Sequence, residues 1–159
     1  MSLQPALTIR IQQADFDIAA ETALLAQGRA DIGAVVTFSG LCRAEDGRLA
    51  ALELEHYPGM AEAEISRIAH EAIERWSLGG LTVIHRVGKI LPGENIVLVI
   101  AASRHRHAAF KAAGFVMDFL KSRAPFWKQE HQADATTGAW VEARDSDEAR
   151  LSDWAVTKN

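Results

Sequence analysis

The sequence predicts a single α+β domain, and three features of the chain lead to this prediction. Runs typical of strands alternate with runs typical of amphipathic helices along the chain. The 159 residues, 48% of them hydrophobic, suffice for one core without disulfides or structural metals. No internal repeat or low-complexity linker divides the sequence. We therefore expect one domain over residues 1–159, in which residues 144–159 form a C-terminal tail.

The first part of the chain predicts three strands and one helix. The strands cover residues 7–12, 33–40 and 49–56. Asp15 can cap a helix that runs to Gln27 and stops at Gly28. The loop between the second and third strands contains Asp46-Gly47, which favours a tight turn. We therefore expect these two strands to pair with each other as a hairpin.

The second part of the chain predicts two longer helices and four more strands. The helices cover residues 60–76 and roughly 107–123, and the strands cover residues 81–87, 95–103, 126–131 and 139–143. The strand at 95–103 is apolar on both faces, which indicates a central position in a sheet. In the tail, Asp145 and Glu148 can form a capping box for a short terminal helix, which Trp154 would anchor.

Composition narrows the kinds of partner that we expect. Cys42 is the single cysteine, so an internal disulfide is excluded and a reducing cytoplasm is favoured. The N-terminus carries no signal-peptide pattern, and no apolar stretch approaches the roughly 20 residues that a membrane span requires. A net charge of −4 argues against general nucleic-acid binding. We expect a cytoplasmic protein whose partner is a small molecule or another protein.

Two lysines flank a rigid Pro-Phe-Trp turn near the end of the last long helix. Pro125 fixes its own φ and disfavours the helical region for Ala124. The helix that carries Lys121 should therefore end near Arg123, and Lys128 should lie on the extended segment after the turn. Two ammonium groups can then converge on one pocket and act in acid–base or nucleophilic chemistry. The alternative is that both are ordinary solvated lysines.

A basic cluster, Arg104-His105-Arg106-His107, lies where a buried strand gives way to a helix. Backbone N–H groups at a helix start favour anions, and arginine adds contacts to phosphate or carboxylate. A solvated basic turn is the alternative. The two histidines could also be a metal pair, but no His-Glu-x-x-His spacing occurs and no acidic ligand stands beside them, so we expect no metal site.

The loop after residue 40 offers a third candidate. An activated thiolate at Cys42 is one interpretation, but no base is recognisable near it in the sequence, and an isolated cysteine is more often a small buried hydrophobe. We therefore favour Arg43 as the functional residue of this loop. Arg144 is a weaker candidate for the same anion-binding work, since a surface salt bridge is the commoner fate of such an arginine.

Six blocks of sequence follow one another in a fixed order. They are GAVVTFSGLCR, LELEHYPGM, VIHRVG, SRHRHAAF, FVMDFLKSRAPFWK and WVEARDSD. In this order, and over nearly the full length, the chain resembles the large, catalytic subunits of molybdopterin synthase, the MoaE family. The resemblance implies an α/β hammerhead-like fold with an additional antiparallel β subdomain. It also implies a heterotetramer, with a central homodimer and one small ubiquitin-like sulfur-carrier subunit of the MoaD type at each end.

The reaction that the resemblance implies is a sulfur transfer in molybdenum cofactor biosynthesis. Cyclic pyranopterin monophosphate, or precursor Z, gains two dithiolene sulfurs and becomes molybdopterin. The C-terminal thiocarboxylate of the small subunit supplies the sulfur, so the large subunit needs no permanently bound cofactor and no nucleophilic cysteine. This implication agrees with the single cysteine of the chain.

The resemblance also implies roles for individual residues. Lys121 and Lys128 match catalytic positions, and Lys121 is our candidate for the chemical step, as the donor of a proton to the departing oxygen or in release of the acylated partner tail. The implied substrate-binding residues are Leu41, Cys42, Arg43, His105, Arg106, Lys121, Lys128, Gln129, Glu130 and Arg144. Arg144 is expected to act across the dimer, and Phe38 and Met117 are expected to shape an apolar pocket wall.

Two other functions remain open from the sequence alone. A self-contained Schiff-base lyase could use Lys121 on a phosphorylated substrate, would turn over without a protein partner, and would be trapped by borohydride. A non-catalytic dimeric scaffold could instead use the basic pocket to bind the terminal carboxylate of a ubiquitin-like partner. Dependence on the partner tests the first alternative, and product formation tests the second.

Overall fold

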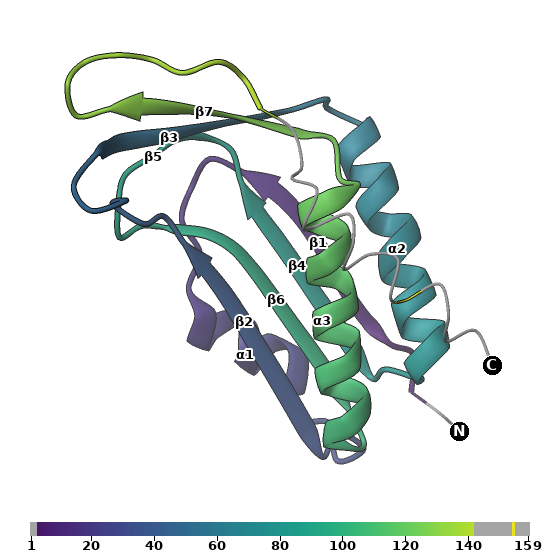
Figure 1. The fold of residues 1–159 in the computed structure, drawn as a ribbon. Coiled ribbons are helices and arrows are strands. Elements are labelled where there is room, and N and C mark those ends of the chain that lie inside the picture. Colours follow the sequence, from purple (N-terminus) through teal and green to yellow (C-terminus); the bar gives the residue numbers. More distant parts are fainter. Residues whose placement is uncertain (1–2, 142–153, 155–159) are drawn as a thin grey trace.

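A computed structural model describes residues 3–141 and Trp154 (Figure 1). Within this part of the chain the structure contains ten helices and strands. In order they are β1 (Ala6–Gln12), α1 (Ile18–Ala26), β2 (Ala34–Leu41), β3 (Leu49–His56), α2 (Met60–Trp76), β4 (Gly80–Arg86), β5 (Gly88–Ile90), β6 (Asn95–Ser103), α3 (Arg106–Ser122) and β7 (Phe126–Gln132). The predicted α+β class is confirmed.

The larger sheet is mixed and has the strand order β1-β4-β6-β2. β1 runs parallel to β4, whereas β4 and β2 both run antiparallel to β6. The central position predicted for residues 95–103 is confirmed, because β6 has a neighbour on each side. Every residue of β4 is buried, as expected for a strand that is covered on both faces.

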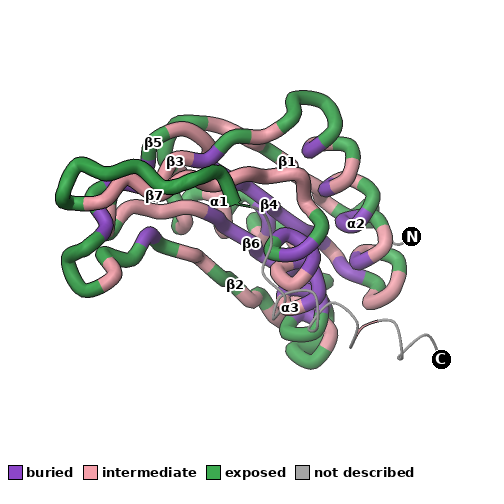
Figure 2. The backbone as a smooth tube through the Cα atoms, turned by 45° about the horizontal axis from the view of Figure 1, so that its top comes forward, coloured by how far each residue is buried: buried purple, intermediate pink, exposed green. Residues whose placement is uncertain are grey.

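Helices cover both faces of the larger sheet (Figure 1). α2 and α3 lie on one face, where Ile65, Val83, Val99 and Val116 belong to the main core. α1 lies on the other face, where Leu25 belongs to a second, smaller core. Figure 2 shows that the buried parts of the chain gather on β4, β6 and the inner sides of α2 and α3.

The second sheet is antiparallel and has the order β5-β3-β7. It lies at the upper end of the molecule in Figure 1, beyond the ends of α2 and α3. This sheet is the additional antiparallel subdomain that the resemblance implies, and it is confirmed. A small core of its own includes Cys42, Leu49, Leu54 and Ile90.

One predicted pairing is wrong. The strands at 33–40 and 49–56 do not form a hairpin, because β2 pairs with β6 in the larger sheet and β3 pairs with β5 and β7 in the smaller one. The intervening loop therefore connects two sheets. β5 was not predicted, because three residues directly after β4 give almost no periodicity.

The predicted helix boundaries are close to those observed. α1 is capped by Asp17, whose carboxylate accepts a hydrogen bond from the Ala20 N–H at 3.0 Å, so Asp15 is not the cap. Asp15 instead accepts a hydrogen bond from Asn95 at 2.9 Å. None of the helices in the described ranges is both long and apolar enough to span a membrane.

The C-terminal predictions hold only in part. After β7 the described chain turns back as far as Val141, and within it Lys128 bridges with Val141 and His131 with Thr137. Residues 142 and 143 of the predicted strand lie outside the described residues. Asp145 and Glu148, the predicted capping box, lie outside the described residues. Trp154 is described, and it packs edge-on against the rings of α2 and α3 and donates a hydrogen bond of 2.6 Å to Asp118.

Candidate active site

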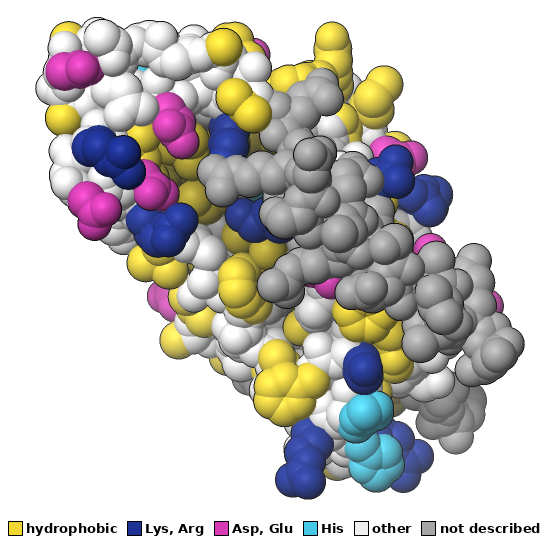
Figure 3. All heavy atoms as spheres, in the orientation of Figure 1, with side chains coloured by type: hydrophobic (Ala, Val, Ile, Leu, Met, Phe, Trp, Pro, Cys, Tyr) yellow, Lys and Arg dark blue, Asp and Glu magenta, His cyan; other side chains and the backbone are white. Residues whose placement is uncertain are grey.

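A pocket of about 300 Å³ lies between the smaller sheet and the C-terminal end of α3. Its side chains come from β3, β4, β6, α3, β7, the end of β2 and the segments that follow β2, α3 and β7. The lining residues are Leu41, Cys42, Arg43, Glu45, Leu49, Leu52, Leu54, His85, Ile96, Leu120, Lys121, Ala124, Phe126, Trp127, Lys128, Glu130 and Val141. In the upper part of Figure 3, a hollow with an apolar floor is ringed by basic and acidic side chains.

The turn between α3 and β7 brings the two lysines to this pocket. α3 ends at Ser122, and the N–H groups of Arg123 and Ala124 both bond the carbonyl of Phe119, at 2.8 and 3.3 Å. Pro125 then starts an extended path that becomes β7. Lys121 on α3 and Lys128 on β7 both line the pocket. The predicted convergence of these lysines from two elements is therefore confirmed.

Side chains along β7 alternate between its two faces, so only every second residue after Trp127 lines the pocket. Lys128 and Glu130 are two positions apart, and both line the pocket. Gln129 lies between them and does not line it; its side-chain amide donates to the carbonyl of Gly138 at 2.9 Å. Glu130 thus lies where a substrate-binding role is possible, and Gln129 does not line the pocket within one chain; the roles of both residues stay predictions.

The segment Leu41-Cys42-Arg43 is tied to the turn between β5 and β6. The N–H of Cys42 bonds the carbonyl of Glu94 at 2.9 Å, and the N–H of Gly93 bonds the carbonyl of Cys42 at 2.7 Å. Cys42 is buried, and this burial raises the pKa of its thiol, with a further contribution from the Glu94, Glu45 and Glu130 charges. The thiol is therefore not an activated thiolate, as we inferred in favouring Arg43.

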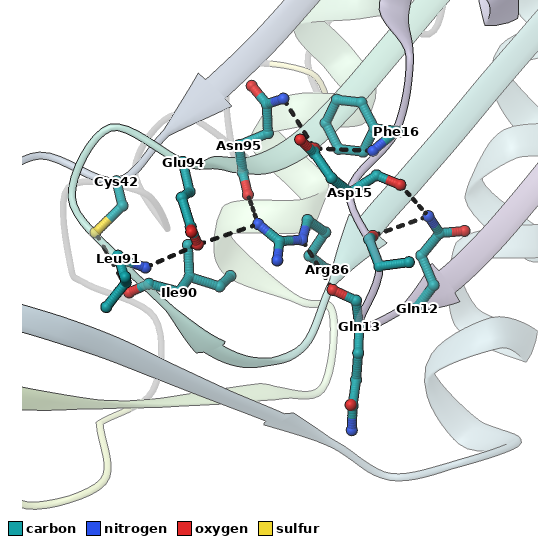
Figure 4. A network of polar contacts seen from close by, with 11 residues as sticks. Gln12, Gln13, Asp15, Phe16, Cys42, Arg86, Ile90, Leu91, Glu94 and Asn95 are labelled. Carbon is teal, nitrogen blue, oxygen red and sulfur yellow. Dashed lines mark hydrogen bonds and ion pairs between the residues drawn. The ribbon is translucent and has the colours of Figure 1, made fainter.

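Arg86 holds this turn in place, as Figure 4 shows. Its side chain is almost fully buried, and it donates to the backbone carbonyls of Gln13 at 3.0 Å and Asn95 at 2.8 Å. Nη1 also lies 3.6 Å from the carboxylate of Glu94, which in turn accepts the N–H of Leu91 at 3.0 Å. The guanidinium thereby links the end of β1, the turn and the start of β6.

His85 lines the pocket, and sequence reasoning missed it. It is buried at the end of β4, and its ring stacks on Phe126 with a centroid distance of 4.0 Å and an interplanar angle of 14°. Burial is the main cause that lowers the pKa of this imidazole to about 4, and the charges of Lys121 and His56 act in the same direction. The signal in the sequence was a polar residue within the apolar run LTVIHRV.

His105 and Arg106 lie far from Lys121 in one chain. They stand at the start of α3, and Lys121 stands at its other end, about 22 Å away at 1.5 Å rise per residue. Arg106 instead lines a second pocket of about 260 Å³, together with His107, Phe110, Lys111 and Trp154. In Figure 3 basic and histidine side chains gather at the lower end of the molecule, where α3 begins. One chain therefore does not place these predicted substrate-binding residues in the lysine pocket.

The remaining predicted residues have different outcomes. Phe38 on β2 is 41% exposed, and Met117 on α3 packs against the main core. Neither residue lines the lysine pocket, so neither forms the predicted wall within one chain. Arg144 lies outside the described residues. The described residues contain no cluster of three or more His, Cys, Asp or Glu side chains that could hold a metal ion.

Comparisons with known proteins agree with the resemblance. The sequence profile of the family described as MoaE protein matches residues 11–123. The molybdopterin synthase catalytic subunit of Mesorhizobium japonicum is 70% identical over 154 residues, which are 97% of each chain. Among solved structures, the molybdopterin biosynthesis MoaE protein from Burkholderia ambifaria has a TM-score of 0.80 at 46% identity, over 94% of this chain and 98% of the other.

A more distant structure has the same fold. Molybdopterin synthase from Staphylococcus aureus has a TM-score of 0.72 at 26% identity, over 89% of this chain and 98% of the other. The matched profile covers well over half of the chain, and the relatives match nearly all of it. The profile match and the high identity to these relatives show that the chain belongs to the MoaE protein family.

Proposed function

We propose that this chain is the catalytic subunit of a molybdopterin synthase. It moves two sulfurs from the thiocarboxylated C-terminus of a small ubiquitin-like subunit to precursor Z and so forms the dithiolene of molybdopterin. The observation that carries the proposal is the convergence of Lys121 and Lys128 on one pocket of about 300 Å³. This volume suits a small ligand.

The pocket has the electrostatics that such a transfer needs. A thiocarboxylate must approach a substrate that bears a phosphate, so both reactants are anions. The lining contains three cations, Arg43, Lys121 and Lys128, and two carboxylates, Glu45 and Glu130. Cations in a confined site reduce the repulsion and hold the reacting atoms together. Lys121 donates a proton to the departing oxygen, and Lys128 with Arg43 binds substrate anions.

A second copy of the chain would complete this site. Three cations against two carboxylates leave the lining with a formal charge of only +1, which is little for two anionic reactants. Arg106 and His105 stand about 22 Å away at the other end of α3. In a homodimer, the start of α3 from one copy can approach the lysine pocket of the other. We propose that His105, Arg106 and Arg144 act on substrate in this way.

The first experiment measures dithiolene formation from precursor Z by the purified protein, with and without a thiocarboxylated small subunit. We expect product only in the complete mixture and near-total loss in Lys121→Ala. Lys89→Ala is the matched control, because Lys89 is an exposed lysine on β5 that does not line the pocket. Turnover without the partner together with a borohydride-trapped adduct would favour the lyase. A stable complex without product would favour the scaffold.

Subunit mixing tests the shared site separately. Lys121→Ala and Arg106→Ala homodimers should each be inactive, but a mixed dimer would carry both substitutions in one site and none in the other. After complete subunit exchange half of the dimers are mixed, so about a quarter of wild-type activity should return. No recovery after exchange, confirmed by mass spectrometry of the mixed dimers, would show that both residues act within one chain.

A further inference from the structure

His85 is a buried polar residue in the lysine pocket for which neither the resemblance nor the proposed mechanism has a role. β4 is buried at every position, so a titratable ring at its end is a cost that packing alone does not explain. His85 as a residue is 8% exposed, and it lines the same pocket as Lys121. The His85 side chain is therefore held by its surroundings and can still contact a ligand in the pocket.

The hydrogen bond of His85 fixes which ring nitrogen carries the proton. Nδ1 lies 2.8 Å from the backbone carbonyl of Arg86. A carbonyl oxygen only accepts, so Nδ1 must be the protonated nitrogen, and in the neutral ring Nε2 carries a lone pair. Nε2 makes no hydrogen bond within the described part of the chain. Among the described residues, Ser122 Oγ is the only side-chain N or O atom that is both inaccessible to solvent and without a hydrogen-bond partner. Nε2 of His85 has no partner either, so it must be accessible to solvent, and His85 lines the pocket.

Packing fixes the plane of the ring. The stacked Phe126 holds one face at 4.0 Å, and Phe126 itself follows the rigid Pro125. Rotation of the imidazole would break both the stack and the hydrogen bond to Arg86. The lone pair of Nε2 therefore has one direction, set by the backbone of β4 and the first residue of β7.

The surroundings keep the ring uncharged. Lys121 on α3 and the titratable His56 on β3 both disfavour its protonation. Lys128 and Glu130 on β7, with Arg43 and Glu45 after β2, line the same pocket. A pKa of about 4 makes the ring a weak base, which is poorly suited to remove a proton near neutral pH. The remaining role for Nε2 is to accept a hydrogen bond.

We propose that His85 is a positioning residue for Lys121: its neutral Nε2 accepts one N–H of the Lys121 ammonium when substrate fills the pocket, and so directs another N–H toward the departing oxygen. The inference rests on the proposed function, since it assigns Lys121 the chemical step. An ammonium has three equivalent donors on a flexible stem, so one fixed acceptor restricts its orientation. No covalent bond to His85 forms in this role.

Two substitutions separate the two ring nitrogens. In His85→Asn the side-chain amide can donate to the Arg86 carbonyl as Nδ1 does, but it offers no acceptor where Nε2 lies. In His85→Gln the longer side chain can place its amide oxygen near the Nε2 position. We expect His85→Asn to lower kcat for dithiolene formation about ten- to a hundredfold with the KM for precursor Z within about twofold, and His85→Gln to recover part of kcat.

Two further measurements make the test decisive. In the Lys121→Ala background, His85→Asn should cause no additional loss, because His85 acts only through Lys121. Nitrogen NMR of wild-type His85 should show a neutral ring with the proton on Nδ1 from pH 6 to 8, and this measurement holds even if a variant does not fold. A proton on Nε2, or kcat of a folded His85→Asn within twofold of wild type, would overturn the inference. Absence of product from the complete wild-type mixture would instead refute the proposed function.

Discussion

Replacement of Arg86 by methionine should destabilise the fold far more than removal of its acidic partner. Methionine keeps most of the length of the side chain but donates no hydrogen bonds. The carbonyls of Gln13 and Asn95 would then lose charged donors at 3.0 and 2.8 Å in a nearly buried site. Hydrogen bonds to a charged group contribute about 1.5–3 kcal/mol each, so we expect a loss of about 3–5 kcal/mol after partial relaxation.

The matched variant is Glu94→Gln. The Glu94 side chain is 43% exposed and its carboxylate lies 3.6 Å from Arg86, so the ion pair contributes less than about 1 kcal/mol. The glutamine oxygen can still accept the N–H of Leu91, which the carboxylate now accepts at 3.0 Å. The backbone contacts of the turn with Cys42 should therefore persist in this variant.

Urea unfolding at a fixed protein concentration measures both variants, because the stability of an oligomer depends on concentration. For a chain of this size, Arg86→Met should lower the midpoint of thermal unfolding by about 10 °C. Equal losses of unfolding free energy in the two variants, or a loss below about 1 kcal/mol for Arg86→Met, would refute the argument that the hydrogen bonds to the two carbonyls provide most of the stabilisation by Arg86. In the folded Arg86→Met fraction, displacement of the turn should also raise the KM for precursor Z through Arg43.

Three other predictions concern single positions. The pKa of His85 is about 4 in the folded protein and 6.5 in the unfolded chain. Below pH 6.5 the unfolded chain therefore binds a proton that the folded protein does not, and the free energy of unfolding should fall by about 3 kcal/mol as the pH falls toward 4. This loss should be absent when unfolding of His85→Gln is measured over the same pH range. Cys42→Ala should sustain dithiolene formation at a rate on the order of wild type, because a buried thiol with a raised pKa supplies no nucleophile; loss of turnover in a folded variant would contradict this. Gly33→Ala should cost roughly 1–3 kcal/mol in urea unfolding, since the new Cβ would lie 2.4 Å from the backbone carbonyl oxygen of Arg104; an unchanged midpoint would show that the backbone yields.

The helices and most strands could be predicted because their signals are local. Apolar residues at helical spacing predicted α2 and α3 within a residue or two of their observed bounds. The Pro125 turn predicted where α3 ends and hence the convergence of Lys121 and Lys128. Each of these features depends on residues within a few positions of one another, so a single sequence contains the information.

Strand pairing and the separation of the two basic clusters could not be predicted in this way. The loop after β2 has turn chemistry, but the strands on either side of it enter different sheets because each finds its partner far along the chain. The distance between Arg106 and Lys121 follows only once both are placed at opposite ends of α3.

The sequence by itself determined the fold class, the helices, the lysine pair and the family, because periodicity, proline geometry and ordered motifs act over short stretches or are matched block by block. Tertiary structure decided that His85 shares the pocket with Lys121, that Gln129 faces away from it, and that Arg86 holds the segment before Arg43. Each of these contacts joins residues that belong to different strands, helices or loops. Their energies depend on burial and on which atoms meet, and the order of residues along the chain states neither.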